Sequence, residues 1–211
     1  FIDPTPGAPN GVNYIGFVTD TGFSVDRGFY DTPISVTIST LTEGAQIRFT
    51  LDGSAPTADS GNIYTNPVAI NSTTVLRAAA YKPNHVPTDV DTHTYIFRDD
   101  IIASDVMDST ITQDPIYGPQ MAEALISIPS ISLVFPGDIS RSEQECSMEL
   151  IGFEDGNTQE DCGMARFGSY VTSFEKRNMR LYFRSDYGAS KLNYPLFSGY
   201  EHGVQPVLKF D

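Results

Sequence analysis

Two cysteines are the side chains of this sequence with the clearest covalent chemistry. Cys146 and Cys162 are its only thiols, and their spacing is compatible with a disulfide. No further cysteine is present to complete a thiolate metal site. Two interpretations are open: a cystine in an oxidising compartment, or two thiols in a reducing one. We expect the disulfide, which would stabilise the protein by about 3 kcal/mol on the chain-entropy model.

Basic residues gather in one segment of a very acidic chain. The formal net charge is −14 and the sequence pI is about 4.4, which argues against general nucleic-acid binding because that needs a basic surface. Residues 166–191 nevertheless carry six basic residues against two acidic ones: Arg166, Lys176, Arg177, Arg180, Arg184 and Lys191. One interpretation is a solvated strand face that pairs with acidic neighbours. No glycine-rich phosphate loop precedes the segment.

Carboxylates occur in close pairs, which raises the question of a calcium site. The pairs are Asp89/Asp91, Asp99/Asp100, Asp105/Asp108 and Glu154/Asp155. None has the EF-hand spacing with its glycine and terminal glutamate, so a calcium site in a loop and solvated carboxylates both stay open. The three histidines have no zinc-ligand spacing, and no local nucleophile motif appears. We therefore assign no metal ligand and no catalytic residue.

Aromatic side chains could serve as stacking platforms for sugar rings. The chain has no tryptophan, the residue best suited to that role. Tyr30, Tyr64 and Tyr81 lie near predicted loops and are the candidates for sugar stacking. The alternative is that these three rings cap a hydrophobic core.

Alternating stretches predict the elements that would position these groups. Residues 34–39 and 47–51 alternate apolar and polar side chains, as half-buried strands do. Asp52 and Gly53 then give a strong turn signal. Short strands that recur about every 8–12 residues, with turn signals between them, indicate a β-sandwich.

The second half is predicted to be α+β with more strand than helix. A helix is expected after Pro119, with Met121, Ala122, Leu125 and Ile126 on one face. Strands are expected over 130–135, 148–153 and 178–184. The domain prediction is a linker or edge segment (1–22), the sandwich (23–98), a linker (99–118) and the α+β unit (119–211).

Within the first half, several short motifs resemble one known family. They are IRFTLDGS at 47–54, Pro56 with Thr57, Tyr64, TTVLRA at 73–78 and TYIF at 94–97. Together they resemble the C-terminal domain of chitobiase and β-hexosaminidase over roughly 23–98. The resemblance implies an immunoglobulin-like sandwich. It does not imply catalysis, because in that family the glycosidase chemistry sits in a separate domain.

The second half resembles the opening part of the spore-coat CotH kinase-like family, over roughly 124–211. The motifs are IPSISL at 128–133, SMELI at 147–151, and above all MRLYFRSDYG at 179–188 with KLNYPLF at 191–197. The resemblance implies part of a secreted atypical kinase fold using Mg-ATP. Lys176, Arg180 or Arg184 would then contact nucleotide phosphates. The family's acidic metal-binding and catalytic motifs lie further downstream and are absent from this sequence.

The combined expectation is a non-catalytic accessory, adhesion or carbohydrate-associated module of a larger secreted or surface bacterial protein. A polysaccharide or a cell-surface partner, and further domains of the same polypeptide, are the expected contacts, and no cofactor is required. The alternatives are part of a CotH-like kinase and a self-assembling extracellular subunit joined through unpaired strand edges. No apolar run approaches 18 residues, so no transmembrane helix is predicted. The start at Phe1 indicates a processed or excised chain.

Overall fold

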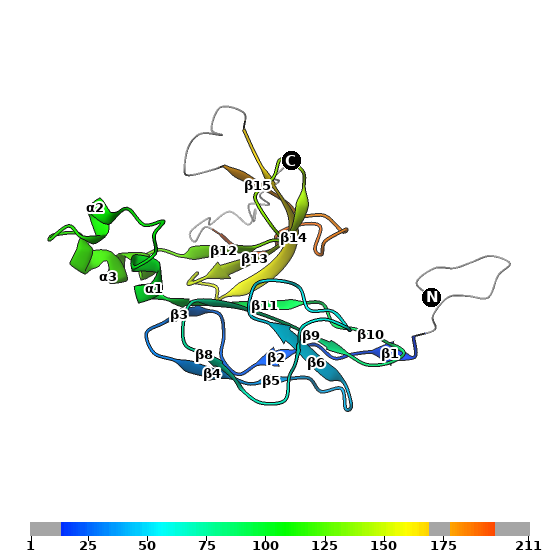
Figure 1. Cartoon of the computed structure of the whole chain (residues 1–211). Coiled ribbons are helices and arrows are strands. Elements are labelled where there is room, and N and C mark those ends of the chain that lie inside the picture. Colours follow the sequence, from blue (N-terminus) through cyan, green and yellow to red (C-terminus); the bar gives the residue numbers. More distant parts are fainter. Residues whose placement is uncertain (1–13, 169–177, 197–211) are drawn as a thin grey trace. The chain divides into compact units, whose positions relative to one another are not determined.

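The computed structural model describes residues 14–168 and 178–196 (Figure 1). The chain divides into two compact units. The first runs to Asp26 and continues over Tyr30–Tyr95, and the second combines Arg27–Phe29 with the chain from Ile96 onward. Strands dominate both units, so the predicted mainly β fold is confirmed.

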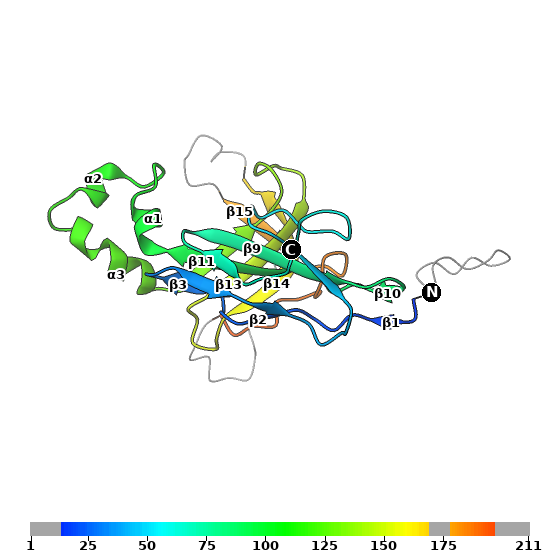
Figure 2. The ribbon, with the colours of Figure 1, turned by 60° about the horizontal axis from the view of Figure 1, so that its bottom comes forward.

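Eleven short strands form along the described chain up to Phe97. They are β1 (Gly16–Phe17), β2 (Gly22–Phe23), β3 (Gly28–Tyr30), β4 (Ile34–Val36), β5 (Ile38–Ser39), β6 (Gln46–Thr50), β7 (Asn62–Ile63), β8 (Val68–Ile70), β9 (Thr74–Tyr81), β10 (His85–Val86) and β11 (Asp91–Phe97). One sheet has the order β3-β11-β9-β6-β7, and Figure 2 shows its two longest strands, β9 and β11, side by side. Separate antiparallel pairs join β4 to β8 and β2 to β5, while β1 pairs with β10 in parallel.

The core of the first unit follows the predicted alternation. Val36 and Ile38 are buried, as expected for the 34–39 stretch, although the structure divides that stretch into β4 and β5. On β9, Leu76 is fully buried and so are all three alanines that follow Arg77. β9 is the middle strand of the five-stranded sheet, which agrees with the burial of these four side chains.

The predicted strand over 47–51 ends one residue early. Thr50 is buried and closes β6, whereas Leu51 is 42% exposed and lies outside the strand. The chain turns here because Gly53 adopts φ +79°, a conformation that glycine tolerates without a steric penalty. Leu51 is therefore not a core residue, and it becomes available at the surface.

The second unit begins with short helices and continues as a four-stranded sheet. The helices are α1 (Arg98–Ile102), α2 (Ser109–Thr112), the 3-10 turn η1 (Gly118–Gln120) and α3 (Met121–Ile126). The strands are β12 (Ser130–Val134), β13 (Gln144–Ile151), β14 (Thr158–Arg166) and β15 (Met179–Tyr182). All neighbours in the order β12-β13-β14-β15 run antiparallel.

The helical segment differs from its prediction. Residues 99–118, expected to be a linker, hold α2 and most of α1, and the helix expected after Pro119 is α3. The expected apolar face of α3 is present, but no residue in any of these helices is buried. Asp108 caps α2 by accepting a hydrogen bond from the Thr110 backbone N–H, which is why a polar stretch can begin a helix.

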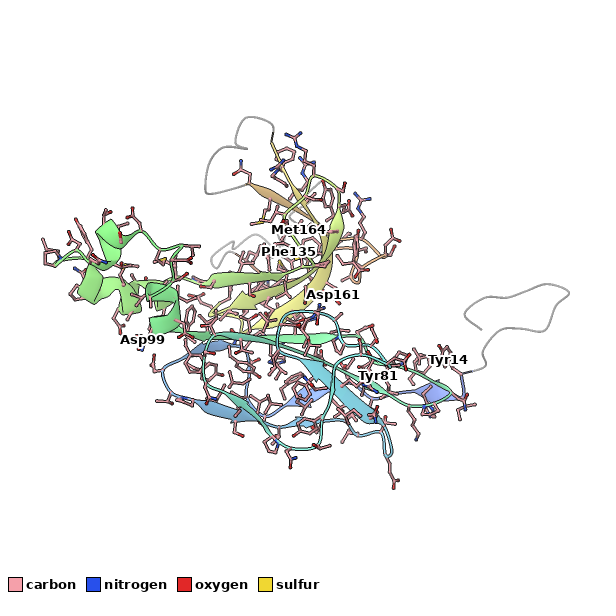
Figure 3. All side chains as sticks on the ribbon, viewed as in Figure 1. Tyr14, Tyr81, Asp99, Phe135, Asp161 and Met164 are labelled. Carbon is pink, nitrogen blue, oxygen red and sulfur yellow. The ribbon has the colours of Figure 1, made fainter. Side chains whose placement is uncertain are left out.

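One face of the four-stranded sheet carries the core of the second unit. The buried cluster consists of Cys146, Met148, Leu150, Cys162, Met164 and Leu192. Phe135 packs against this cluster, and Figure 3 labels it beside Met164. On the opposite face Glu149 is fully buried, with its carboxylate 3.5 Å from the Arg27 guanidinium of the same unit.

Candidate functional site

A hollow of about 600 Å³ opens on the first unit where β6 ends. One wall is the turn after β6, with Leu51, Asp52 and Ser54, and the other is the segment 60–62 that leads into β7. The two walls converge because β7 pairs with β6, which sets Asn62 opposite Phe49. The hollow is therefore built by the motif LDGS at 51–54 and the motif SGN at 60–62, with five residues between them.

Two arginines and a tyrosine hold the walls in place. The Arg77 guanidinium donates to the Gly53 carbonyl at 3.2 Å, and the Arg48 guanidinium donates to the Gly61 carbonyl at 3.1 Å. The Tyr81 hydroxyl donates to the Pro56 carbonyl at 2.8 Å, beneath the loop that joins the walls. These hydrogen bonds fix the backbone of the loop, so the site is preorganised. Neither arginine is among the residues that line the hollow.

Asp52 is the one charged side chain among the lining residues. Its Oδ1 accepts from the Ser54 backbone N–H at 3.0 Å and from the Ser54 hydroxyl at 2.6 Å. These hydrogen bonds hold the pKa of the Asp52 carboxyl below its usual value. The group is therefore ionised at neutral pH.

The remaining groups suit hydrogen bonding to a neutral polar ligand. Asn62 is exposed and offers an amide donor and acceptor, and the Ser60 hydroxyl shares a 2.8 Å hydrogen bond with Thr57. Leu51 supplies an apolar patch on the same rim. A few fixed polar groups beside an apolar surface are the usual composition of a small-ligand site.

The three candidate sugar-stacking tyrosines are partly buried and do not line this hollow. Tyr30 donates to the Asp26 carbonyl at 2.5 Å and lies 5.7 Å from the Tyr95 ring. Tyr64 meets Phe49 edge-on at 6.4 Å, and Tyr81 has the bond to Pro56. Burial raises the pKa of both Tyr30 and Tyr81. Their role in stacking stays a prediction.

The candidate phosphate contacts are occupied by protein groups where they are described. The Arg180 guanidinium lies 3.7 Å from the centre of the Phe167 ring. Arg184 forms an ion pair with Glu143 at 3.2 Å and stacks over Tyr182. Lys176 lies outside the described residues. The phosphate-binding role of these residues stays a prediction.

The two cysteines face one another across neighbouring strands. Cys146 on β13 is the direct antiparallel partner of Cys162 on β14, and both are buried. Both side chains are thiols in this structure. The Cys146 side chain, and then burial, raise the pKa of the Cys162 thiol far above its usual value. The register is compatible with the predicted disulfide.

The carboxylate pairs are scattered in the described structure. Over residues 14–168 and 178–196, no three or more His, Cys, Asp or Glu side chains converge on one point. A loop calcium site stays a prediction. In that same part of the chain, no helix has the length and apolar character needed to cross a bilayer.

The hollow lies within the part of the chain that is similar to a known family. Residues 25–92 match the family model described as the chitobiase/beta-hexosaminidase C-terminal domain. No curated protein and no solved structure matches the chain. No comparison supports the resemblance of the second half to the CotH kinase-like family. About a third of the chain, including both walls of the hollow, is therefore similar to the chitobiase/β-hexosaminidase C-terminal domain.

Proposed function

We propose that the chain is a non-catalytic accessory module that binds carbohydrate through the hollow between Asp52 and Asn62. Its place would be a larger secreted or cell-surface bacterial protein. The match over residues 25–92 supports the carbohydrate association, since chitobiase and β-hexosaminidase act on amino sugars by their names. The observation that carries the proposal is a preorganised polar hollow within the matched region.

The charge of the site favours a neutral glycan. Asp52 is ionised, while the Arg48 and Arg77 guanidinium groups donate to backbone carbonyls behind the walls. With a net charge of −14 on the chain, a sulfated or uronic polysaccharide would be repelled. Uncharged sugars such as N-acetylhexosamines offer hydroxyl and amide groups that Asp52 and Asn62 can pair with.

The affinity should be modest, because the hollow is open and offers few polar partners. Four hydrogen bonds at a net value of about 1 kcal/mol each would give a dissociation constant on the order of 1 mM for an oligosaccharide. A polymer that presents many such sugars would be retained more strongly through avidity. A soluble or insoluble polysaccharide is therefore a better first probe than a monosaccharide.

The experiment is affinity electrophoresis of the 211-residue chain in gels that contain neutral or anionic polysaccharides. We expect retardation by a neutral N-acetylhexosamine polymer such as glycol chitin and none by an anionic one. Asn62→Ala should weaken retention about tenfold, the cost of one well-placed polar contact near 1.4 kcal/mol. Asp52→Asn should also weaken it, although asparagine keeps the Oδ1 acceptor for Ser54.

Matched controls separate the hollow from general surface effects. Asn66→Ala removes the same group from an exposed loop residue that does not line the hollow, and Asp89→Asn removes the same charge elsewhere on the first unit. Both should bind like the original chain. Equal losses in the controls and the hollow variants, or no retardation in any neutral polysaccharide, would contradict the proposed site.

A further inference from the structure

The four-stranded sheet of the second unit has an edge strand at each end. The order β12-β13-β14-β15 leaves β12 and β15 with a neighbour on one side only, among the described residues. The two edge strands have similar lengths, five and four residues. An edge strand presents backbone donors and acceptors in one direction, so each edge can pair with a further strand. Figure 1 shows both strands at the borders of this sheet.

Apolar side chains extend to both edges on the same face of the sheet. Ile131 on β12 is the partner of buried Leu150, so it lies on the core face, yet it is 54% exposed. Met179 on β15 lies two residues before half-buried Leu181 on that same face and is 42% exposed. The apolar face of the sheet therefore continues to each edge without being covered there by the described residues.

The direction of the strands allows the sheet to continue into a second copy. Each neighbouring pair is antiparallel, so the four strands alternate and β15 runs opposite to β12. A second copy whose β12 lies along β15 therefore continues the antiparallel ladder without turning the sheet over. In the register that places the core faces of both copies on the same side of the joined sheet, Ile131 lies beside Leu181 and Leu133 lies beside Met179.

The segments next to the two edge strands carry opposite net charges. Residues 98–128, which lead into β12, carry one basic residue and six acidic ones: Asp99, Asp100, Asp105, Asp108, Asp114 and Glu123. Around β15, the described residues of 166–191 carry four basic residues, Arg166, Arg180, Arg184 and Lys191, against Asp186. Antiparallel pairing brings the start of β12 beside the end of β15, so the acidic segment of one copy approaches Arg184 of the next, which also forms an ion pair with Glu143 of its own chain at 3.2 Å.

We propose that the partner of these edges is a second copy of this chain, joined head to tail through β12 of one copy and β15 of the next. The contact is heterologous, because two different surfaces meet. Each addition therefore leaves one edge of each kind open, and the assembly grows as a series unless the copies close into a ring. Opposite local charges make the contact weaker in high salt.

Sedimentation velocity of the 211-residue chain over a range of concentrations tests the proposal. We expect species of increasing size as the concentration rises. Ile131→Lys places a charge on the β12 edge and Met179→Glu places one on the β15 edge. Each should weaken association about tenfold or more, because a charge on an edge opposes strand pairing. Leu41→Lys, which adds the same charge at a 90% exposed site in the first unit, should assemble normally.

A mixture of the two edge variants is the decisive sample. Ile131→Lys keeps a functional β15 edge and Met179→Glu keeps a functional β12 edge, so an equimolar mixture should form dimers and no larger species. Circular dichroism establishes that both variants are folded, as expected from their exposed positions. A chain that is monomeric at every concentration would overturn the proposal. So would edge variants that assemble like the original chain, or a mixture that stays monomeric.

Discussion

The structure allows us to predict a disulfide between Cys146 and Cys162 and the stability that it adds. The two residues are direct partners in the β13–β14 register. Opposite residues in an antiparallel pair have Cα atoms about 4.5–5.5 Å apart, within the range of about 4.4–6.8 Å that a disulfide spans. We therefore predict that a disulfide forms without displacing either strand when the protein is exposed to an oxidant such as oxidised glutathione.

The expected stabilisation comes from the loop that the disulfide closes, because the bond lowers the entropy of that loop in the unfolded chain. Fifteen residues separate the two cysteines, and closing a loop of that size in the unfolded chain is worth about 3 kcal/mol on the entropic model. With a denaturant slope near 2 kcal/mol per molar urea, the unfolding midpoint of the second unit should move by about 1.5 M. Forming the disulfide removes only two hydrogen atoms from the core. It therefore leaves no cavity whose cost would reduce this stabilisation.

The assay compares the same protein with and without reductant. Intact mass should rise by about 2 Da on reduction, because the disulfide takes up two hydrogens. Hydrogen exchange of peptides from β13 and β14 should then report earlier unfolding in urea for the reduced sample. A Cys146→Ala, Cys162→Ala double variant is the control and should be insensitive to reductant. An unchanged mass would show that the disulfide does not form, and equal urea midpoints for the oxidised and reduced protein would show that it does not stabilise the sheet.

Two further predictions concern the same sheet. Gly163→Ala should destabilise the second unit by about 1–3 kcal/mol through overpacking, since its Cβ would lie 2.6 Å from both Glu143 and Tyr187. Gly188→Ala is the milder comparison, with its nearest contact at 3.3 Å, and urea unfolding measures both. The reduced protein should lose stability as pH rises above about 8.5, the pKa of an unfolded cysteine, because the Cys162 pKa is raised in the folded state. Thermal unfolding at several pH values checks this, and the disulfide form should not show the loss.

Local alternation was sufficient to predict much of the first unit. The stretch 34–39 forms β4 and β5, and the strand predicted from Ile47 is β6, because the apolar residues of both stretches recur at period two and are bounded by turn residues. The end of β6 was placed too late because Leu51 continues that alternation in sequence. The turn conformation of Gly53 overrides the pattern and exposes Leu51.

The second unit was harder to predict for two physical reasons. Strand β14 begins with Thr158 and three polar residues, a sequence with low strand propensity, and is held by pairing with β13 and β15. Of the two helices in the expected linker, α2 begins at the Asp108 cap, whereas α1 has no side-chain cap, and neither contains a buried residue. Both elements are decided by contacts or capping that composition does not reveal.

The hollow was not predicted because it depends on tertiary pairing. In sequence, Leu51 fits only a strand and Asp52 only a turn, and no pattern singles out Asn62. The pairing of β7 with β6 sets Asn62 opposite Phe49 and so joins the two walls. The one available signal was that two clusters of turn residues, LDGS and SGN, flank a buried proline, Pro56.

Carbohydrate binding in the hollow is tested most directly by two-dimensional amide NMR of the chain during titration with a neutral N-acetylglucosamine oligosaccharide. We predict saturable shifts concentrated at the amides of Gly53, Gly61 and Asn62, with a dissociation constant on the order of 1 mM. The Asn62→Ala variant should require about ten times more ligand. Saturable shifts confined to other parts of the chain, or no shifts at millimolar ligand, would contradict the claim.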